Sequence, residues 1–281
     1  MSAVRREFFA RILRALKDGT LELPSLPDIA LEVRSIALER DLALNELVQV
    51  IQQDPGLSAY LIKIGNSAQY NRGRVVSSLT TALTRLGIDA TRDLTASYAI
   101  RTLFFLKEPT IKGHLRAVWQ RSVHTAAMAH VMAPRCGFPT EKALLAGLMQ
   151  DIGALPILAQ LQHFPDLAAN PASVQELLQQ FAGKVSGLIL NAWGFEPAMV
   201  VVGLDREAWL RDRQPAPELV DLILVARYHT YIGQPGFKAL PPLPDMPAFA
   251  KLDLGALGPE QGLLFLKEAK AELEALRLAL Q

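Results

Sequence analysis

The segment QDPGLSAYLIKIGNSAQY, residues 53–70, decides the fold class. Its apolar residues recur at i, i+3, i+4 and i+7, namely Leu57, Tyr60, Leu61 and Ile64. This spacing places side chains on one face of an α-helix. An Asp-Pro-Gly sequence precedes the apolar run and a Gly-Asn-Ser sequence follows it, so the segment predicts a short amphipathic helix between two breaks.

The helical period continues on both sides of this segment. Apolar stripes with the same spacing occupy residues 44–51 and 76–86, and a longer one begins at Leu94. Ser173 with Glu176 has the spacing of a capping box at a helix start. Since no stretch alternates apolar and polar residues over the length of a strand, we expect an all-α fold.

The composition excludes several classes of protein. The chain has 281 residues, with 29 Lys and Arg against 28 Asp and Glu, and half of its residues are apolar. A disordered chain would be less apolar and more strongly charged, and a generally basic nucleic-acid binder would carry an excess of positive charge. Cys136 is the single cysteine, which excludes an internal disulfide and favours a reducing compartment.

The apolar runs are short. None approaches the ~20 residues that a membrane-spanning helix needs, and charged residues interrupt those of the N-terminus, which is unlike a signal peptide. We therefore expect a cytoplasmic protein with no membrane partner.

Three parts are expected along the chain. Residues 1–108 predict an N-terminal lobe of short helices, and residues 109–235 predict a second lobe of longer, more apolar helices. Residues 236–281 predict a proline- and glycine-rich surface loop followed by a last helix at about 259–281. The stretch FFLKEPTIKGH, residues 104–114, is a linker candidate because proline and glycine break helices.

The last helix carries an apolar seam at heptad spacing, formed by Leu266, Ala269, Leu273, Leu276 and Leu280. Two alternatives fit so short a seam. The helix docks on its own domain, or it pairs with a second copy of the chain to form a homodimer.

Six segments in a fixed order resemble the HDOD family of bacterial signalling domains, which is related to the HD and HD-GYP phosphohydrolases. They are LPSLPDIALEV (23–33), QDPGLSAYLIKIGNSAQY (53–70), VVSSLTTALTRLGI (75–88), WQRS (119–122), LLAGLMQDIGALPI (144–157) and SGLILNAWGF (186–195). The resemblance extends over about residues 20–235. It implies an all-helical, two-lobed fold and a role in signal transduction, usually without known catalysis.

The resemblance also indicates where an HD enzyme would hold its metal ion with His and Asp side chains. At those positions this chain carries Arg121, Gln150, Asp151, Lys184, Arg206 and Arg227. Asp151 is the one remaining ligand type, and His124, three residues after Arg121, is a polar residue expected near it. Because a catalytic metal usually needs three or more ligands and arginine repels a cation, we expect a degenerate HD domain that binds no metal or other cofactor.

The leading prediction is therefore a non-catalytic module for signal transduction and protein–protein interaction, whose signalling partner is unidentified. The alternative is a metal-dependent phosphohydrolase, acting on nucleotides or cyclic dinucleotides, with a rearranged site. If the positions converge, three arginines surround Asp151. We expect Arg121 to pair with Asp151 and tie two helices together, and the remaining positive charge to be a candidate site for an anion such as a phosphate group.

Two further sequence features each allow a structural and a functional interpretation. The Gly65-Asn66-Ser67 sequence is either a structural bend or a ligand loop. A basic cluster, formed by Arg72, Arg74, Arg85 and Arg92, is either a solvated face or a nucleic-acid site. Acidic residues interleave this cluster and no aromatic residue stacks with it, so a nucleic-acid partner is not expected.

Overall fold

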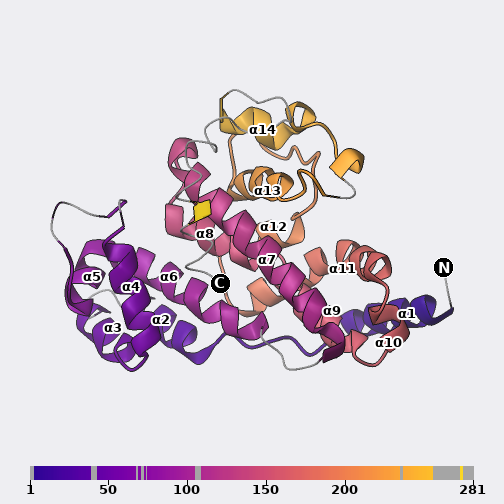
Figure 1. Ribbon diagram of the computed structural model, residues 1–281, viewed down its shortest axis with the longest axis horizontal. Helices are drawn as coiled ribbons and strands as arrows, with labels where there is room; N and C mark the ends of the chain where they lie inside the picture. The colour runs from indigo at the N-terminus through magenta and orange to yellow at the C-terminus, as the bar shows by residue number, and fades with distance from the viewer. Residues whose placement is uncertain are drawn as a thin grey trace. The chain divides into compact units, whose positions relative to one another are not determined.

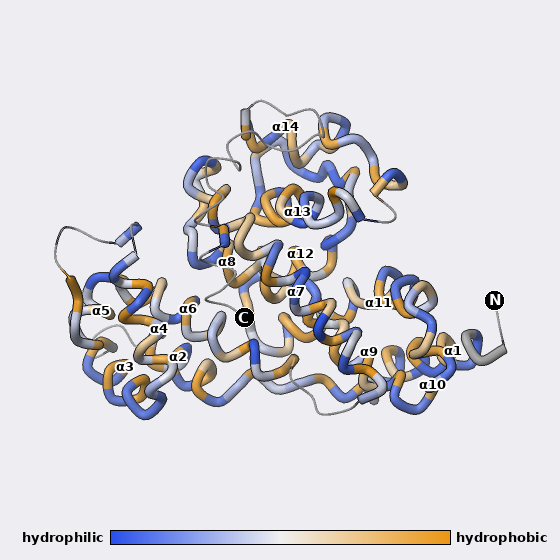
Figure 2. Tube along the Cα trace, in the orientation of Figure 1, coloured by the Kyte–Doolittle hydropathy of each residue, from blue (hydrophilic) through white to orange (hydrophobic). Residues whose placement is uncertain are grey.

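The computed structural model describes most of the chain, namely residues 3–38, 43–67, 69–70, 73, 75–104, 109–234, 237–255 and 273–274. Within these ranges the regular elements are α-helices and short 3₁₀ helices, without any strand (Figure 1). The all-α prediction is confirmed. Most of the helices carry both apolar and polar residues, as expected where one face of each helix is buried (Figure 2).

The chain divides into two compact units. Unit 2 is residues 26–102, and unit 1 joins residues 1–25 to residues 103–281. This division differs from the expected first lobe, residues 1–108, because the N-terminal helix belongs to the other unit.

Unit 2 is a bundle of five helices: α2 (Asp28–Leu38), α3 (Ala43–Ile51), α4 (Pro55–Gly65), α5 (Leu79–Leu86) and α6 (Ile88–Ile100). α6 packs against α2, α4 and α5, which places it at the centre of the bundle. Asp54 caps α4 as expected for an acidic residue at a helix start, since its Oδ1 accepts a hydrogen bond from the Leu57 N–H at 2.9 Å.

The Gly65-Asn66-Ser67 sequence forms a structural bend. Asn66 is the C-cap of α4, and its side chain donates to the Val76 carbonyl at 2.8 Å and accepts from the Val76 N–H at 2.7 Å. These two bonds connect the end of α4 to the segment that precedes α5. The contacts of Asn66 thus serve the fold, as the structural alternative proposes.

Unit 1 consists of the remaining helices: α1 (Ala3–Lys17), α7 (Pro109–Met132), α8 (Thr140–Met149), α9 (Ala154–Leu161), α10 (Pro165–Ala168), α11 (Pro171–Ala192), α12 (Pro197–Leu204), α13 (Leu219–His229) and α14 (Pro247–Leu252). Short 3₁₀ helices occupy Ala133–Cys136, Phe237–Ala239 and Leu243–Asp245, and another, Arg101–Phe104, contains the boundary between the two units in the sequence. α7 runs through the middle of the unit and packs against α8, α9 and α13 (Figure 1). Every residue of α13 is buried, so this helix forms the centre of the core.

The stretch from α8 to α9, Thr140–Leu161, is long and apolar enough to span a membrane by length and composition. In this structure 89% of its most apolar window is buried inside the protein, as in a core element. The turn between α8 and α9 lies in this buried region.

The N-terminal helix packs on unit 1 through aromatic contacts. The ring of Phe8 lies edge-on to Phe164, with centroids 5.3 Å apart, and Phe9 lies 4.7 Å from Phe181. The expected boundary at residue 108 assumed that neighbours in sequence share a lobe. These contacts show that α1 instead buries its apolar face against helices more than 150 residues later in the chain.

Three local expectations were wrong. The linker candidate at residues 104–114 contains the start of α7, because Pro109 occupies the first helical turn, where proline is tolerated, and Gly113 lies inside the helix. The helix start expected at Ser173 lies earlier, with Asn170 as its N-cap. The loop after residue 236 is not all on the surface, since Leu243 and Met246 are fully buried.

The last helix, expected at about 259–281, lies outside the described residues except for residues 273–274. It stays a prediction, and so does the homodimer that it would form.

Candidate functional site

The turn that carries Gln150 and Asp151 is held in place by α11. The Ser186 hydroxyl donates to the Gln150 carbonyl at 3.0 Å and accepts from the Gly153 N–H at 2.9 Å. A β-carbon on Gly153 would lie 2.3 Å from the Ala182 carbonyl oxygen, so only glycine allows this close approach. One hydroxyl and one glycine therefore fix the position of the Asp151 side chain.

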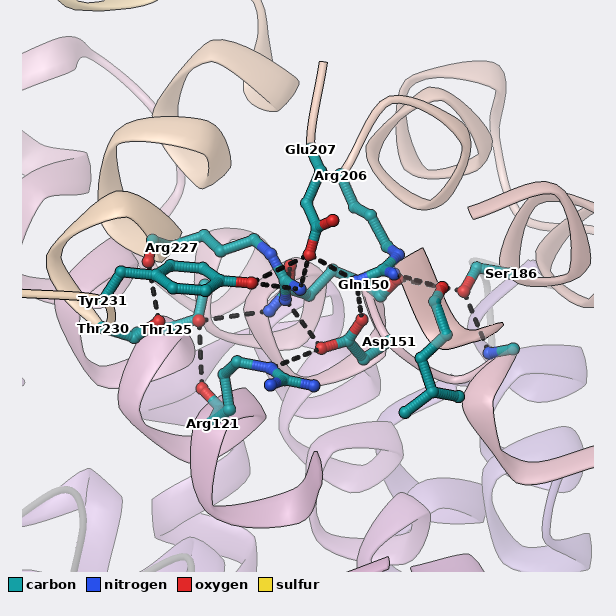
Figure 3. A network of polar contacts seen from close by, with 12 residues as sticks. Arg121, Thr125, Gln150, Asp151, Ser186, Arg206, Glu207, Arg227, Thr230 and Tyr231 are labelled. Atoms are coloured by element: carbon teal, nitrogen blue, oxygen red, sulfur yellow. Dashed lines mark hydrogen bonds and ion pairs between the residues drawn. The ribbon is translucent and has the colours of Figure 1, made fainter. Parts of the chain in front are cut away.

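Three arginines from three parts of unit 1 surround this carboxylate (Figure 3). Arg121 on α7 donates from Nε to Oδ2 at 3.1 Å, so the expected pair is present in the structure. Arg227 on α13 donates to the same oxygen at 2.6 Å. Arg206, in the turn after α12, donates to Oδ1 at 2.5 Å, and its second η nitrogen donates to the Leu178 carbonyl. Both oxygens of Asp151 are thus engaged by guanidinium groups.

A second carboxylate, Glu207, completes the cluster. Its Oε1 accepts from Arg227, from Arg206 at 3.1 Å and from the Tyr231 hydroxyl at 2.9 Å. The Arg227 guanidinium therefore lies between two carboxylates, with its Cζ 5.8 Å from the centre of the Tyr231 ring.

Gln150 extends the cluster to α7. Its side-chain carbonyl accepts from Arg227 at 2.9 Å, and its amide nitrogen donates to the Thr125 hydroxyl at 3.1 Å. Thr125 in turn donates to the Arg121 carbonyl at 3.0 Å. Side chains from α7, α13 and the two turns thus form one hydrogen-bonded network, drawn in Figure 3.

Burial and the neighbouring charges shift the pKa of Asp151 in opposite directions, and this residue is 1% exposed. Burial raises the pKa of the carboxyl group, but the attraction of Arg206, Arg227 and Arg121 is stronger and holds the pKa well below its usual range. Burial likewise raises the pKa of Glu207, and Arg227 and Arg206 bring it below its ordinary value. Both groups are anions at neutral pH, so three guanidinium groups face two carboxylates and leave one net positive charge.

A cavity of about 160 Å³ opens beside the cluster. The cluster residues Arg121, Arg206, Glu207 and Tyr231 form one side. The rest of the wall is mostly apolar and is formed by Ala117, Val118, Pro171, Val174 and Leu178. His114, Gln175 and Gln179 add polar groups.

The structure brings together five of the six positions that the resemblance indicated, namely Arg121, Gln150, Asp151, Arg206 and Arg227. Lys184 is the exception, because it is exposed on α11. Ala182, two residues earlier, is the one that faces the interior, and two residues along a helix turn a side chain by about 200°. The α7 residue that bonds to the network one turn after Arg121 is Thr125, whereas His124 is partly exposed.

The sequence interpretation missed several members of the network, namely Thr125, Ser186, Glu207 and Tyr231. Three cations around one buried carboxylate indicate that a second anion is needed, but not which acidic residue supplies it. Tyr231 follows Arg227 at i+4, which places the two side chains on the same face.

The cluster is a poor site for a divalent metal ion. Among the described residues, no group of three or more His, Cys, Asp or Glu side chains is placed to share a metal. An ion at Asp151 would displace arginine hydrogen bonds and meet the charge of three guanidinium groups. The arrangement instead holds two buried anions and three cations in fixed positions.

Solved structures with the same fold come from several bacteria. A protein of Shewanella amazonensis SB2B, provisionally named a metal-dependent phosphohydrolase, matches with a TM-score of 0.80 at 23% identity, covering 100% of both chains. An HDOD domain protein of unknown function from Geobacter sulfurreducens matches with a TM-score of 0.62 at 20% identity, over 99% of this chain and 96% of that one. A protein of Marinobacter aquaeolei VT8, provisionally named a signal transduction protein, matches with a TM-score of 0.57 at 20% identity, over 99% of this chain and 66% of that one.

Sequence comparison places the chain in a family. A curated protein of Treponema pallidum (strain Nichols), named only as uncharacterized, is 23% identical over 170 residues, which are 59% of this chain and 31% of that protein. This chain thus spans about a third of the length of that relative. The model of the HDOD domain matches residues 23–205, more than half of the chain. With these residues matched, the chain belongs to the HDOD domain family.

Proposed function

We propose that this protein is a non-catalytic signalling module that acts by binding a partner protein in the cytoplasm. In this proposal the salt-bridge cluster around Asp151 takes the structural place of the metal ion in HD phosphohydrolases. It ties together α7, the α8–α9 turn and α13, so that the lobe keeps its shape without metal.

The observation that carries the proposal is the donor set around Asp151. Both of its oxygens accept hydrogen bonds from arginine, and Arg227 is fully buried with its guanidinium between Asp151 and Glu207. Arginine stays protonated at all physiological pH values, so it cannot become a metal ligand. The membership of the HDOD family supports a signalling role.

The alternative is a phosphohydrolase with a rearranged metal site. The provisional name of the Shewanella amazonensis protein is the reason to test it. The two functions differ in a measurable property, because only the enzyme needs a bound metal at Asp151.

The test measures metal content and hydrolysis in one preparation of the full chain. We expect a substoichiometric amount of transition metal, and no hydrolysis of nucleotides or cyclic dinucleotides with added Mn²⁺, Mg²⁺ or Fe²⁺. A metal bound at one or more ions per chain, and lost in the Asp151→Asn variant, would contradict the proposal.

The same variant tests the structural role of the cluster. Removing one partner of a buried ion pair leaves the other charges uncompensated, so Asp151→Asn should lower the free energy of unfolding by roughly 3–5 kcal/mol, measured by urea denaturation in EDTA. Asp89→Asn is the matched control. The Asp89 side chain is 81% exposed and pairs with Arg92 at the surface, so it should contribute less than about 1 kcal/mol.

A further inference from the structure

The wall of the cavity beside Asp151 contains a guanidinium group, that of Arg121, with donors available to a ligand. Arg121 donates to Asp151 through Nε alone, and its two η nitrogens have no hydrogen-bond partner among the described residues (Figure 3). Its side chain is 25% exposed, whereas those of Arg206 and Arg227 are at most 3% exposed and bind acceptors through their η nitrogens. Arg121 is therefore the member of the cluster that remains able to bind a ligand.

The charge of the cluster favours an anion in this cavity. The three guanidinium groups exceed the two carboxylates by one, and Glu207 has its Oε1 occupied by Arg206, Arg227 and Tyr231. One negative charge near Arg121 would bring the cluster to neutrality. A partly buried site strengthens such an attraction because it is screened less than at the open surface.

The size and lining of the cavity limit the ligand. A volume of about 160 Å³ is below the roughly 300–1,000 Å³ of pockets that enclose drug-sized molecules. Val118, Val174 and Leu178 provide an apolar wall, and Gln175 and Gln179 provide exposed amide groups at the rim. The site fits an anionic group with at most a small apolar body.

We propose that this cavity binds a small oxyanion of single charge, a carboxylate or a monoprotonated phosphate group, through the η nitrogens of Arg121. The planar fork of a guanidinium suits both groups, because each presents two oxygens at the matching spacing. The proposal rests on the proposed function, since a metal centre at Asp151 would require these arginines to lie elsewhere.

The experiment measures the melting temperature of the full chain in EDTA, at constant ionic strength, while sodium chloride is replaced by sodium phosphate or sodium acetate at pH 6. A ligand that binds the folded state raises the melting temperature in a saturable way. We expect such a rise with at least one of the two oxyanions, and none with chloride alone.

Two neighbouring glutamines provide the variants. Gln179 lines the cavity and Gln180 does not, although both are exposed on α11. Gln179→Glu should weaken the apparent affinity roughly three- to tenfold, because it places a negative charge at the rim. Gln180→Glu adds the same charge outside the cavity and should leave the affinity close to that of the wild type.

Each outcome decides the proposal. A response to phosphate alone or to acetate alone identifies the group, and a response to both shows a general oxyanion site. Melting temperatures that are the same in phosphate, acetate and chloride would overturn the proposal, as would equal weakening by both glutamate variants. Because EDTA is present and inorganic phosphate has no ester bond to cleave, the result is independent of the metal and hydrolysis assays that test the proposed function.

Discussion

At the scale of single residues, Arg227 shows how a buried charge is compensated. It is fully buried on α13, a helix whose residues are all buried, and a charge in such a place costs several kcal/mol unless it is paired and hydrogen-bonded. Asp151, Glu207 and Gln150 supply acceptors for its η nitrogens. The identity of Arg227 was readable from the sequence, but its second carboxylate partner was not.

His130 predicts how stability depends on pH. It is 8% exposed on α7, and burial lowers its pKa from 6.5 to about 4. Since the pKa in the unfolded chain is higher, the stabilising contribution is complete above pH 6.5 and is lost as the pH falls towards 4. We expect the free energy of unfolding to drop by roughly 2 kcal/mol from this group between pH 7 and pH 5.

Urea denaturation at several pH values measures this loss. His130→Gln should flatten the dependence on pH, whereas His163→Gln should leave it unchanged, because His163 is exposed. Burial also lowers the pKa of His229, so some dependence should persist in the first variant. An unaltered slope in His130→Gln would show that its pKa is ordinary.

At the scale of elements, the contact between the α8–α9 turn and α11 positions the site. The sequence predicted long apolar helices in this part of the chain, because the clustering of apolar residues is a local property of the sequence. The cap of α11 was missed because asparagine and serine are both favoured at helix starts. In the structure Asn170 is the cap, since its side chain accepts a hydrogen bond from the Ser173 N–H at 3.1 Å.

Two glycines test this contact. A β-carbon on Gly153 would lie 2.3 Å from both the Ala182 carbonyl oxygen and the Ser186 nitrogen, so Gly153→Ala should destabilise the protein by roughly 3 kcal/mol or more. Gly113→Ala is the matched control inside α7, where nothing lies within 4 Å of the new carbon. It should stabilise the protein by up to about 1 kcal/mol, since alanine favours helix.

The midpoints of urea denaturation measure both changes. A Gly153→Ala variant as stable as the wild type would show that the turn and α11 move apart at little cost, and that Asp151 is not held by this contact.

At the scale of the whole molecule, the two units do not follow the order of the chain. Residues 1–25 fold with residues 103–281, while unit 2 is formed by the segment between them. The reason is the apolar face of α1, where Phe8 and Ile12 are fully buried. A local pattern shows that such a face exists but not which distant helices cover it.

Truncation of Phe8 tests this assignment. Phe8→Ala should lower the free energy of unfolding of unit 1 by roughly 3–5 kcal/mol, because it removes a buried aromatic ring from its contact with Phe164. Hydrogen exchange should accelerate in α9 and α11 and stay unchanged in α3–α5. Leu13→Ala, at a position 52% exposed, is the control and should change neither the free energy of unfolding nor the hydrogen exchange. Faster exchange in α3–α5 would contradict the division of the chain.

The sequence by itself determined the helical class and the HDOD membership, and it predicted that Arg121, Asp151 and Arg227 converge. These depend on local periodicity and on residue identities that can be read in order along the chain. The tertiary structure alone decided that Glu207 joins the cluster, that Lys184 points to solvent and that α1 belongs to unit 1. Each of these follows from the rotation of a helix or from contacts between residues far apart in sequence, where a shift of one or two positions turns a side chain from the interior to the surface.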